Sequence, residues 1–157
     1  MDRDLQRELV GMAEEDERVR EELAATGELF QGYAPRMAEV HSRNGEALEK
    51  IVLEHGWPGK KLVGVRGARA AWLILQHAIG SPSLQRGCLP LLKEAAERGD
   101  IDPAQVAYLE DRICFFEKRP QRYGTQFGWD KEGKMSPWTL EDPEKVDEYR
   151  KSVGLGT

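Results

Sequence analysis

The sequence predicts a mainly α fold, a single-domain helical bundle of about five helices with a short C-terminal hairpin region and a terminal helix. Between residues 4 and 117, apolar residues recur at alternating three- and four-residue steps, the spacing of amphipathic helices. After Pro120 this spacing ends, and two short extended segments flank the turn-like DKEG at 130–133. We therefore expect one domain over 1–157, with the bundle in 1–119 and the hairpin and last helix in 120–157.

Apolar stripes and helix-ending residues place the individual elements. The expected helices of the bundle span about 4–26, 34–55, 65–79, 82–99 and 103–117. Glycine follows the first two, and the last two begin with a cap residue directly before proline. The third contains AAWLIL and should be the most buried. RYGTQFGW and KMSPWTL are the expected hairpin strands, and Asp142-Pro143 should cap a last short helix that ends before Gly154.

Charge and cysteine usage narrow the classes of partner. Lys and Arg total 23 against 28 Asp and Glu, a net charge of -5, so we expect neither nucleic acid nor a membrane as partner. Cys88 and Cys114 show no CxxC spacing and fit a helical core in a reducing compartment. The charged start MDRDLQREL and the shortness of the longest apolar run favour a cytoplasmic location.

Polar residues at core positions of two helices mark the first candidate site. Asp16 interrupts the apolar stripe of the first helix, and His41, Asn44 and His55 interrupt that of the second. Short connections predict antiparallel neighbours, which brings Asp16 level with His41 and Asn44. The same argument for the third helix brings His77 to that level, with Gln76 nearby.

This convergence has three interpretations. Asp16 and His41 form a buried hydrogen-bonded network that fixes helix register, or the carboxylate orients an imidazole as general base while a second imidazole acts as acid. In that second case Asn44 or Gln76 would hold a substrate oxygen. Third, Asp16, His41 and His77 form a metal-binding triad. No cofactor is favoured, although a divalent metal is compatible with the third interpretation.

Two loops add further candidates. In HGWPG at 55–59, His55 fits a helix cap better than a catalytic role but is retained as a catalytic candidate, and Trp57 is a candidate pocket wall. Asp111-Arg112 fits a surface or intrahelical ion pair, with Arg112 as a candidate ligand contact. The loop YGTQ supplies Tyr123, Thr125 and Gln126, which suit either a turn or the orientation of a polar ligand.

Six motifs are spread over most of the chain: EHGWPG at 54–59, AAWLILQHA at 70–78, CLPLL at 88–92, AYLEDRI at 107–113, PQRYGTQF at 120–127 and EDPEKVDEYRKSVGL at 141–155. With them the chain resembles a largely bacterial family of domains of unknown function. The resemblance implies a set of signature positions, namely Asp16, His55, Trp57, Pro58, Gln76, His77, Asp111, Arg112, Tyr123, Thr125 and Gln126. The chain departs from the family pattern at 78–83 and at His41, where the family is more often acidic.

These observations lead to one main hypothesis and two alternatives. The main one is a small cofactor-independent acid–base enzyme, of lyase, cyclase or hydrolase type, that acts on a polar small molecule in specialised metabolism. His77 would be acid or base with Asp16 and His41 behind it, and Tyr123 and Gln126 would orient the substrate. The first alternative is a non-catalytic module whose aromatic region, Tyr123 to Trp138, docks a protein partner or a second copy of the chain. The second is a metal-dependent enzyme that uses Asp16, His41 and His77.

Overall fold

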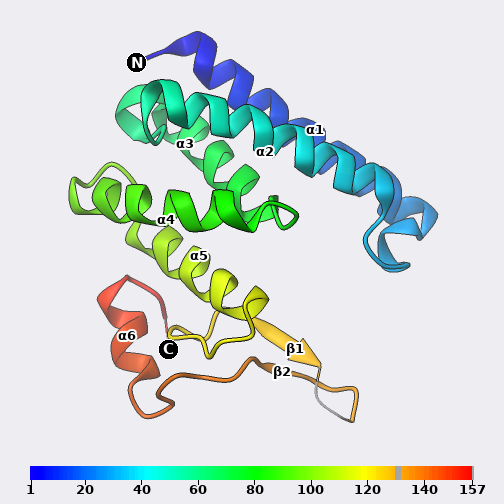
Figure 1. The fold of residues 1–157 in the computed structure, drawn as a ribbon, viewed down its shortest axis with the longest axis vertical. Coiled ribbons are helices and arrows are strands. Elements are labelled where there is room, and N and C mark those ends of the chain that lie inside the picture. The colour runs from blue at the N-terminus through cyan, green and yellow to red at the C-terminus, as the bar shows by residue number, and fades with distance from the viewer. Residues whose placement is uncertain (130–131, 157) are drawn as a thin grey trace. The chain divides into compact units, whose positions relative to one another are not determined.

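The computed structural model describes residues 1–129 and 132–156. This part of the chain contains six α-helices, one 3-10 turn and one two-stranded antiparallel sheet, so the predicted mainly α class is confirmed (Figure 1). The elements are α1 (Arg3–Thr26), η1 (Glu28–Phe30), α2 (Pro35–His55), α3 (Lys60–His77), α4 (Pro82–Glu97), α5 (Pro103–Phe116), β1 (Phe127–Trp129), β2 (Met135–Pro137) and α6 (Val146–Ser152).

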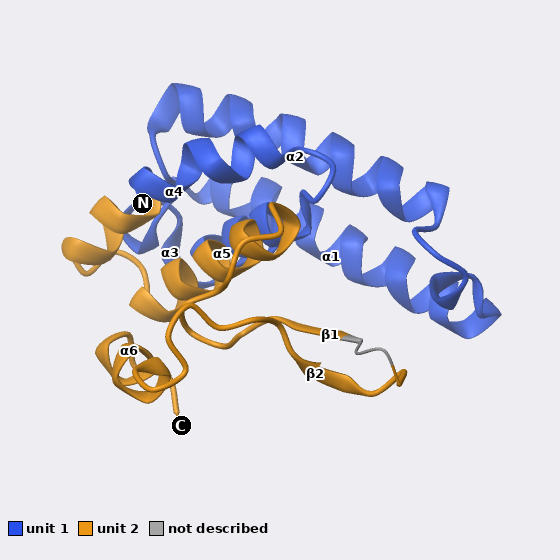
Figure 2. Cartoon of the chain, turned by 60° about the horizontal axis from the view of Figure 1, so that its bottom comes forward, with its two compact units in different colours: residues 1–91 blue, residues 92–157 orange. Residues whose placement is uncertain are grey.

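The chain divides into two compact units, residues 1–91 and 92–157 (Figure 2). The first unit holds α1, α2, α3 and the first part of α4, and the second holds the rest of the chain. This division lies within α4, whereas sequence reasoning placed a subdivision between residues 119 and 120. Whether the chain is a single domain stays a prediction.

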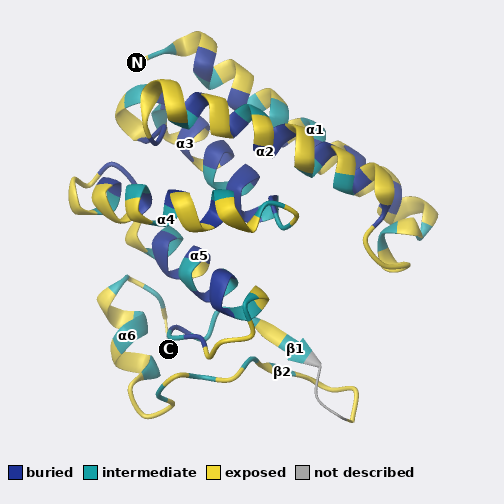
Figure 3. Cartoon of the chain, viewed as in Figure 1, coloured by how far each residue is buried: buried dark blue, intermediate teal, exposed yellow. Residues whose placement is uncertain are grey.

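The first two helices of unit 1 form the expected antiparallel hairpin. The Asp2 side chain caps α1 by accepting from the backbone N–H of Leu5 at 3.0 Å, and Gly27 ends the helix with a positive φ of 82°. Ion pairs then join Glu22 to Arg36 and Glu15 to Arg43. The sequence separation within each pair grows with distance from the connection, as it does in two antiparallel helices. Each of the two helices buries one stripe of residues and exposes its opposite face (Figure 3), which is the predicted amphipathic pattern.

The third helix differs from its expected bounds. It begins at Lys60 rather than near 65 and ends at His77, and its first turn is separated from the rest by Gly64, whose φ of 73° and ψ of 175° are not helical. A glycine that breaks the helix in its second turn looks, in sequence, like the end of a loop. The remainder buries an apolar set as predicted: Gly67, Ala68, Ala70, Ala71, Ile74 and Leu75.

In unit 2, a hairpin is present as β1 and β2, with Phe127 opposite Pro137 and Gly128 opposite Ser136. Both strands are shorter than the expected RYGTQFGW and KMSPWTL, and 122–126 is a loop because its backbone N–H groups bond to the Asp111 side chain rather than to a second strand. The expected turn of the hairpin at 130–133 lies partly outside the described residues. The last helix begins at Val146, because the residues after Asp142-Pro143 first form a turn in which the Asp142 carboxylate accepts from Glu144 N–H at 3.2 Å. None of the described helices is long and apolar enough to cross a membrane.

Candidate functional site

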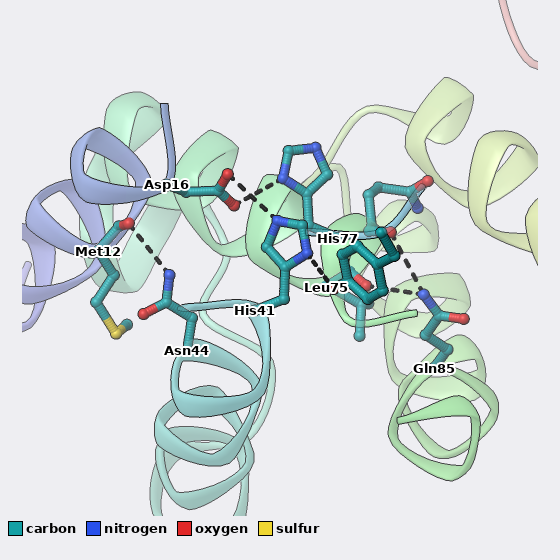
Figure 4. A network of polar contacts seen from close by, with 9 residues as sticks. Met12, Asp16, His41, Asn44, Leu75, His77 and Gln85 are labelled. Atoms are coloured by element: carbon teal, nitrogen blue, oxygen red, sulfur yellow. Dashed lines mark hydrogen bonds and ion pairs between the residues drawn. The ribbon is translucent and has the colours of Figure 1, made fainter. Parts of the chain in front are cut away.

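Three helices of unit 1 bring one carboxylate and two imidazoles together. Asp16 on α1 lies 2.7 Å from His77 on α3, measured from Oδ2 to Nδ1. It lies 3.4 Å from His41 on α2, measured from Oδ1 to Nε2. The two imidazole rings are 5.1 Å apart, centre to centre, at an angle of 47°. We call these three residues the Asp16 cluster, and Figure 4 shows the carboxylate facing both rings, with a dashed line to each.

The Asp16 carboxylate is buried, with 1% of its side chain exposed, yet it is ionised. Burial raises its pKa, but the close polar contacts with His41 and His77 and the charges of both imidazoles outweigh this effect, so the net pKa lies well below the ordinary value. An ionised carboxylate only accepts hydrogen bonds, which means that Nδ1 of His77 carries the proton in their 2.7 Å contact. The lone pair of a neutral His77 is then on Nε2.

The two imidazoles differ in what holds them. His77 is 19% exposed and is fixed by the short contact with Asp16. His41 is 12% exposed, and its Nδ1 lies 2.6 Å from the Tyr33 hydroxyl, whose ring also stacks on it with centres 5.7 Å apart. Sequence reasoning missed Tyr33, because it precedes α2 in a connection without helical periodicity. No spacing rule would have paired it with His41.

Asn44 is adjacent to the cluster but has a local partner. Its amide donates to the backbone carbonyl of Met12 at 3.2 Å and so joins α2 to α1 within one turn of Asp16 (Figure 4). Gln76 is buried beside His77 in sequence, and its backbone carbonyl accepts from Gln85 at 3.5 Å. Gln85, which is fully buried and also donates to Leu75, was not foreseen from the sequence.

His55 belongs to a different part of unit 1. It ends α2 before Gly56, and its Nε2 lies 3.7 Å from Glu54. It borders an open groove of about 570 Å³ that is lined mainly by charged residues, including Asp4, Glu8 and Lys50. Trp57 is buried, and its Nε1 has no hydrogen-bond partner among the described residues. HGWPG thus ends α2, as predicted, and the Trp57 ring is part of the core.

The candidates of unit 2 are organised by Asp111. This residue is fully buried, and its carboxylate accepts from the backbone N–H groups of Arg122, Tyr123 and Thr125 and from the Thr125 hydroxyl, at 2.9 to 3.2 Å. The expectation of an Asp111-Arg112 surface or intrahelical ion pair therefore misplaced Asp111, which holds the loop. The reason is that sequence spacing along a helix does not show which distant loop returns to it.

The same loop uses most of the polar groups that had been assigned to a ligand. The backbone N–H of Gln126 donates to Oε1 of Gln121 at 2.9 Å, and its side-chain amide donates to Oγ1 of Thr125 at 3.2 Å. Tyr123 is buried against the Tyr149 ring, and its carbonyl accepts from Arg150 at 2.8 Å. Burial lowers the pKa of Arg112. Gln121, fully buried at the centre of these contacts, was not foreseen either.

Comparisons with known proteins give a family and no reaction. The model of a family of unknown function, DUF6624, matches residues 3–157, nearly the full length. Neither the curated proteins nor the solved structures contain a match to the chain. The chain therefore belongs to the DUF6624 family.

Proposed function

For this member of a family without an assigned reaction, we propose an acid–base enzyme that acts on a polar small molecule at the Asp16 cluster. The observation that carries the proposal is the 2.7 Å contact between the buried Asp16 carboxylate and Nδ1 of His77. A carboxylate in this position fixes the tautomer and the orientation of an imidazole and stabilises the imidazolium that forms when Nε2 takes a proton.

The second imidazole supplies the complementary acid. His41 lies opposite His77, with ring centres 5.1 Å apart, and shares the Asp16 carboxylate with it. Because both rings contact the same buried carboxylate, an acid on one ring and a base on the other would lie side by side. The partial exposure of both rings lets a small polar molecule reach them.

The remaining candidates have weaker support as ligand contacts. Asn44 uses its amide to join two helices, the Thr125 hydroxyl donates to Asp111, and Gln126 is engaged within its own loop. Contacts of Trp57, Gln76, Arg112 or Tyr123 with a ligand stay predictions, as do the bacterial distribution, the role in specialised metabolism and the cytoplasmic location.

The test compares the activities of two proteins on many compounds, because the proposal does not name one substrate. Wild-type protein and the His77→Ala variant are compared on a panel of esters, amides, sugars and hydroxy acids, and a reaction counts only if the variant loses it. Removal of a general acid or base is expected to slow that reaction by about 10²- to 10⁴-fold.

His55→Ala is the matched control, because this imidazole ends α2 in a groove of its own and should leave the rate unchanged. Equal turnover by wild type and His77→Ala on every compound would remove His77 from any chemistry.

A second candidate function is a protein-interaction module, which an exposed apolar face of the hairpin favours. Phe127 and Met135 are each more than half exposed, and Pro137, opposite Phe127, is exposed on the same face. Exposed clusters of this kind are typical of docking surfaces. Sedimentation velocity on the wild type and on Phe127→Ser tests self-association: a dimer that the substitution abolishes supports this candidate, and monomers throughout contradict a homodimer.

A further inference from the structure

The Asp16 cluster offers one donor atom from each of three side chains, and these atoms lie within 4.8 Å of one another. One carboxylate oxygen and two imidazole nitrogens form a set that binds zinc and related divalent transition ions. Each residue comes from a different helix, α1, α2 or α3. The tertiary fold therefore assembles the three donors, which lie far apart in the sequence.

A second, independent observation points into the same place. Asp16 Oδ1 and His41 Nε2 are both buried atoms without a hydrogen-bond partner among the described residues. They face each other at 3.4 Å, which is longer than an ordinary N–H···O hydrogen bond. Buried polar atoms without a partner are costly and rare, and a cation between this oxygen and this nitrogen would satisfy both.

The surroundings hold the donors in the orientation that an ion needs. Metal-binding imidazoles generally use their second nitrogen for a hydrogen bond outside the metal site, which fixes the ring and its tautomer. His41 has this arrangement, because its Nδ1 contacts the Tyr33 hydroxyl at 2.6 Å while its Nε2 faces Asp16. The Asn44 contact with Met12 holds α2 against α1 at the same level.

We infer that Asp16, His41 and His77 bind a single divalent transition-metal ion, with Tyr33 as the outer partner of His41. Three protein donors leave a further coordination position, and the partial exposure of both imidazoles places it on the solvent side. This is the composition of a catalytic metal site rather than of a closed structural one. Binding displaces the proton from Nδ1 of His77, which is released to solvent.

The inference goes beyond the proposed acid–base function and does not depend on it, because metal binding is measured without a substrate. If the ion binds, a metal-bound water becomes available as the base at this position. If it does not bind, the acid–base proposal stands on its own assay.

The test is a titration of chelator-treated full-length protein with Co²⁺, followed by visible absorption, and with Zn²⁺, followed by calorimetry. We expect one ion per chain. The His41→Ala and His77→Ala variants should each weaken binding by more than about 100-fold, beyond the loss typical of removing an outer partner, and Tyr33→Phe by about 10-fold.

The third histidine of the chain provides the control. His55→Ala should bind one ion as tightly as the wild type, since His55 lies in the separate groove at the end of α2. No stoichiometric binding by the wild type would overturn the inference, as would equal binding by His77→Ala or a loss confined to His55→Ala.

A measurement on the unaltered chain covers the case in which a variant fails to fold. Nitrogen-detected NMR of the histidine rings is expected to show Zn²⁺-dependent shifts for two of the three imidazoles, with His55 unchanged. Shifts of His55 alone, or of none, would count against the site.

Discussion

Asp111 illustrates how a single buried carboxylate can organise a loop. It has no exposed surface and accepts backbone N–H groups from Arg122, Tyr123 and Thr125. Hydrogen bonds to a charged group are stronger than those between neutral groups, and the donors become unsatisfied when the carboxylate is removed. The signature residues of this loop therefore have a structural explanation.

Replacing Asp111 by alanine should destabilise the protein by about 3 kcal/mol, because three backbone N–H groups lose their acceptor at about 1 kcal/mol each. Urea unfolding measures the change, and faster amide exchange at residues 122–125 locates it. Asp142→Ala is the control, since that carboxylate accepts one exposed N–H and its removal should cost less than about 1 kcal/mol. Equal effects of the two substitutions would contradict the anchoring role of Asp111.

Cys88 gives a prediction for alkaline pH. Burial, followed by the negative charge of Glu49, raises the pKa of its thiol from 9.0 to about 11. Between these values the native state keeps a proton that the unfolded state releases, so the free energy of unfolding falls as pH rises from 9 to 11. Below pH 9 the thiol is protonated in both states and contributes no pH dependence.

Urea unfolding of the wild type and of Cys88→Ala across this range isolates the effect, because the variant lacks the titrating thiol. The wild type should lose stability relative to the variant as pH rises. A constant difference between the two proteins from pH 8 to 11 would show that the thiol titrates normally.

Two glycines of unit 1 have opposite effects on the helices that contain them. Gly11 lies in the middle of α1, exposed, with open space around the position of a Cβ atom. Gly64 interrupts α3 with a φ of 73° and a ψ of 175°, a conformation that only glycine adopts readily. The first therefore only weakens its helix, while the second makes the bend at the start of α3.

Alanine at the two positions should shift stability in opposite directions. Gly11→Ala is expected to stabilise the protein by about 0.5 to 1 kcal/mol through helix propensity. Gly64→Ala should destabilise it by about 1 to 3 kcal/mol, because the side chains nearest its new Cβ, Gln6 and Met1, are flexible and leave the backbone strain as the main cost. Thermal unfolding of both variants checks the signs, and a stabilising Gly64→Ala would show that α3 straightens without cost.

For the whole molecule, net charge is the property that most limits its partners. A charge of -5 produces a field that repels polyanions at long range. We expect no binding of duplex DNA at an ionic strength of about 0.15 M, where the screening length is about 8 Å. Fluorescence anisotropy with a labelled duplex measures this, and salt-dependent binding in the micromolar range would require a basic surface that the charge balance does not predict.

The sequence by itself determined the helical class, the order of the elements and the level at which Asp16, His41 and His77 meet. Periodicity gives the buried face of each helix, and short connections make neighbouring helices antiparallel, so positions far apart in the chain can be aligned by number. These two rules alone place the three polar side chains at one level of the bundle.

Only the tertiary structure decided which atoms face one another. It placed Tyr33 on His41, gave Asp111 to the loop at 122–125, and set His55 in a groove apart from the other imidazoles. The physical reason is that loops lack periodicity and that side-chain orientation depends on packing, so sequence spacing fixes the level and face of a residue but not its contacts.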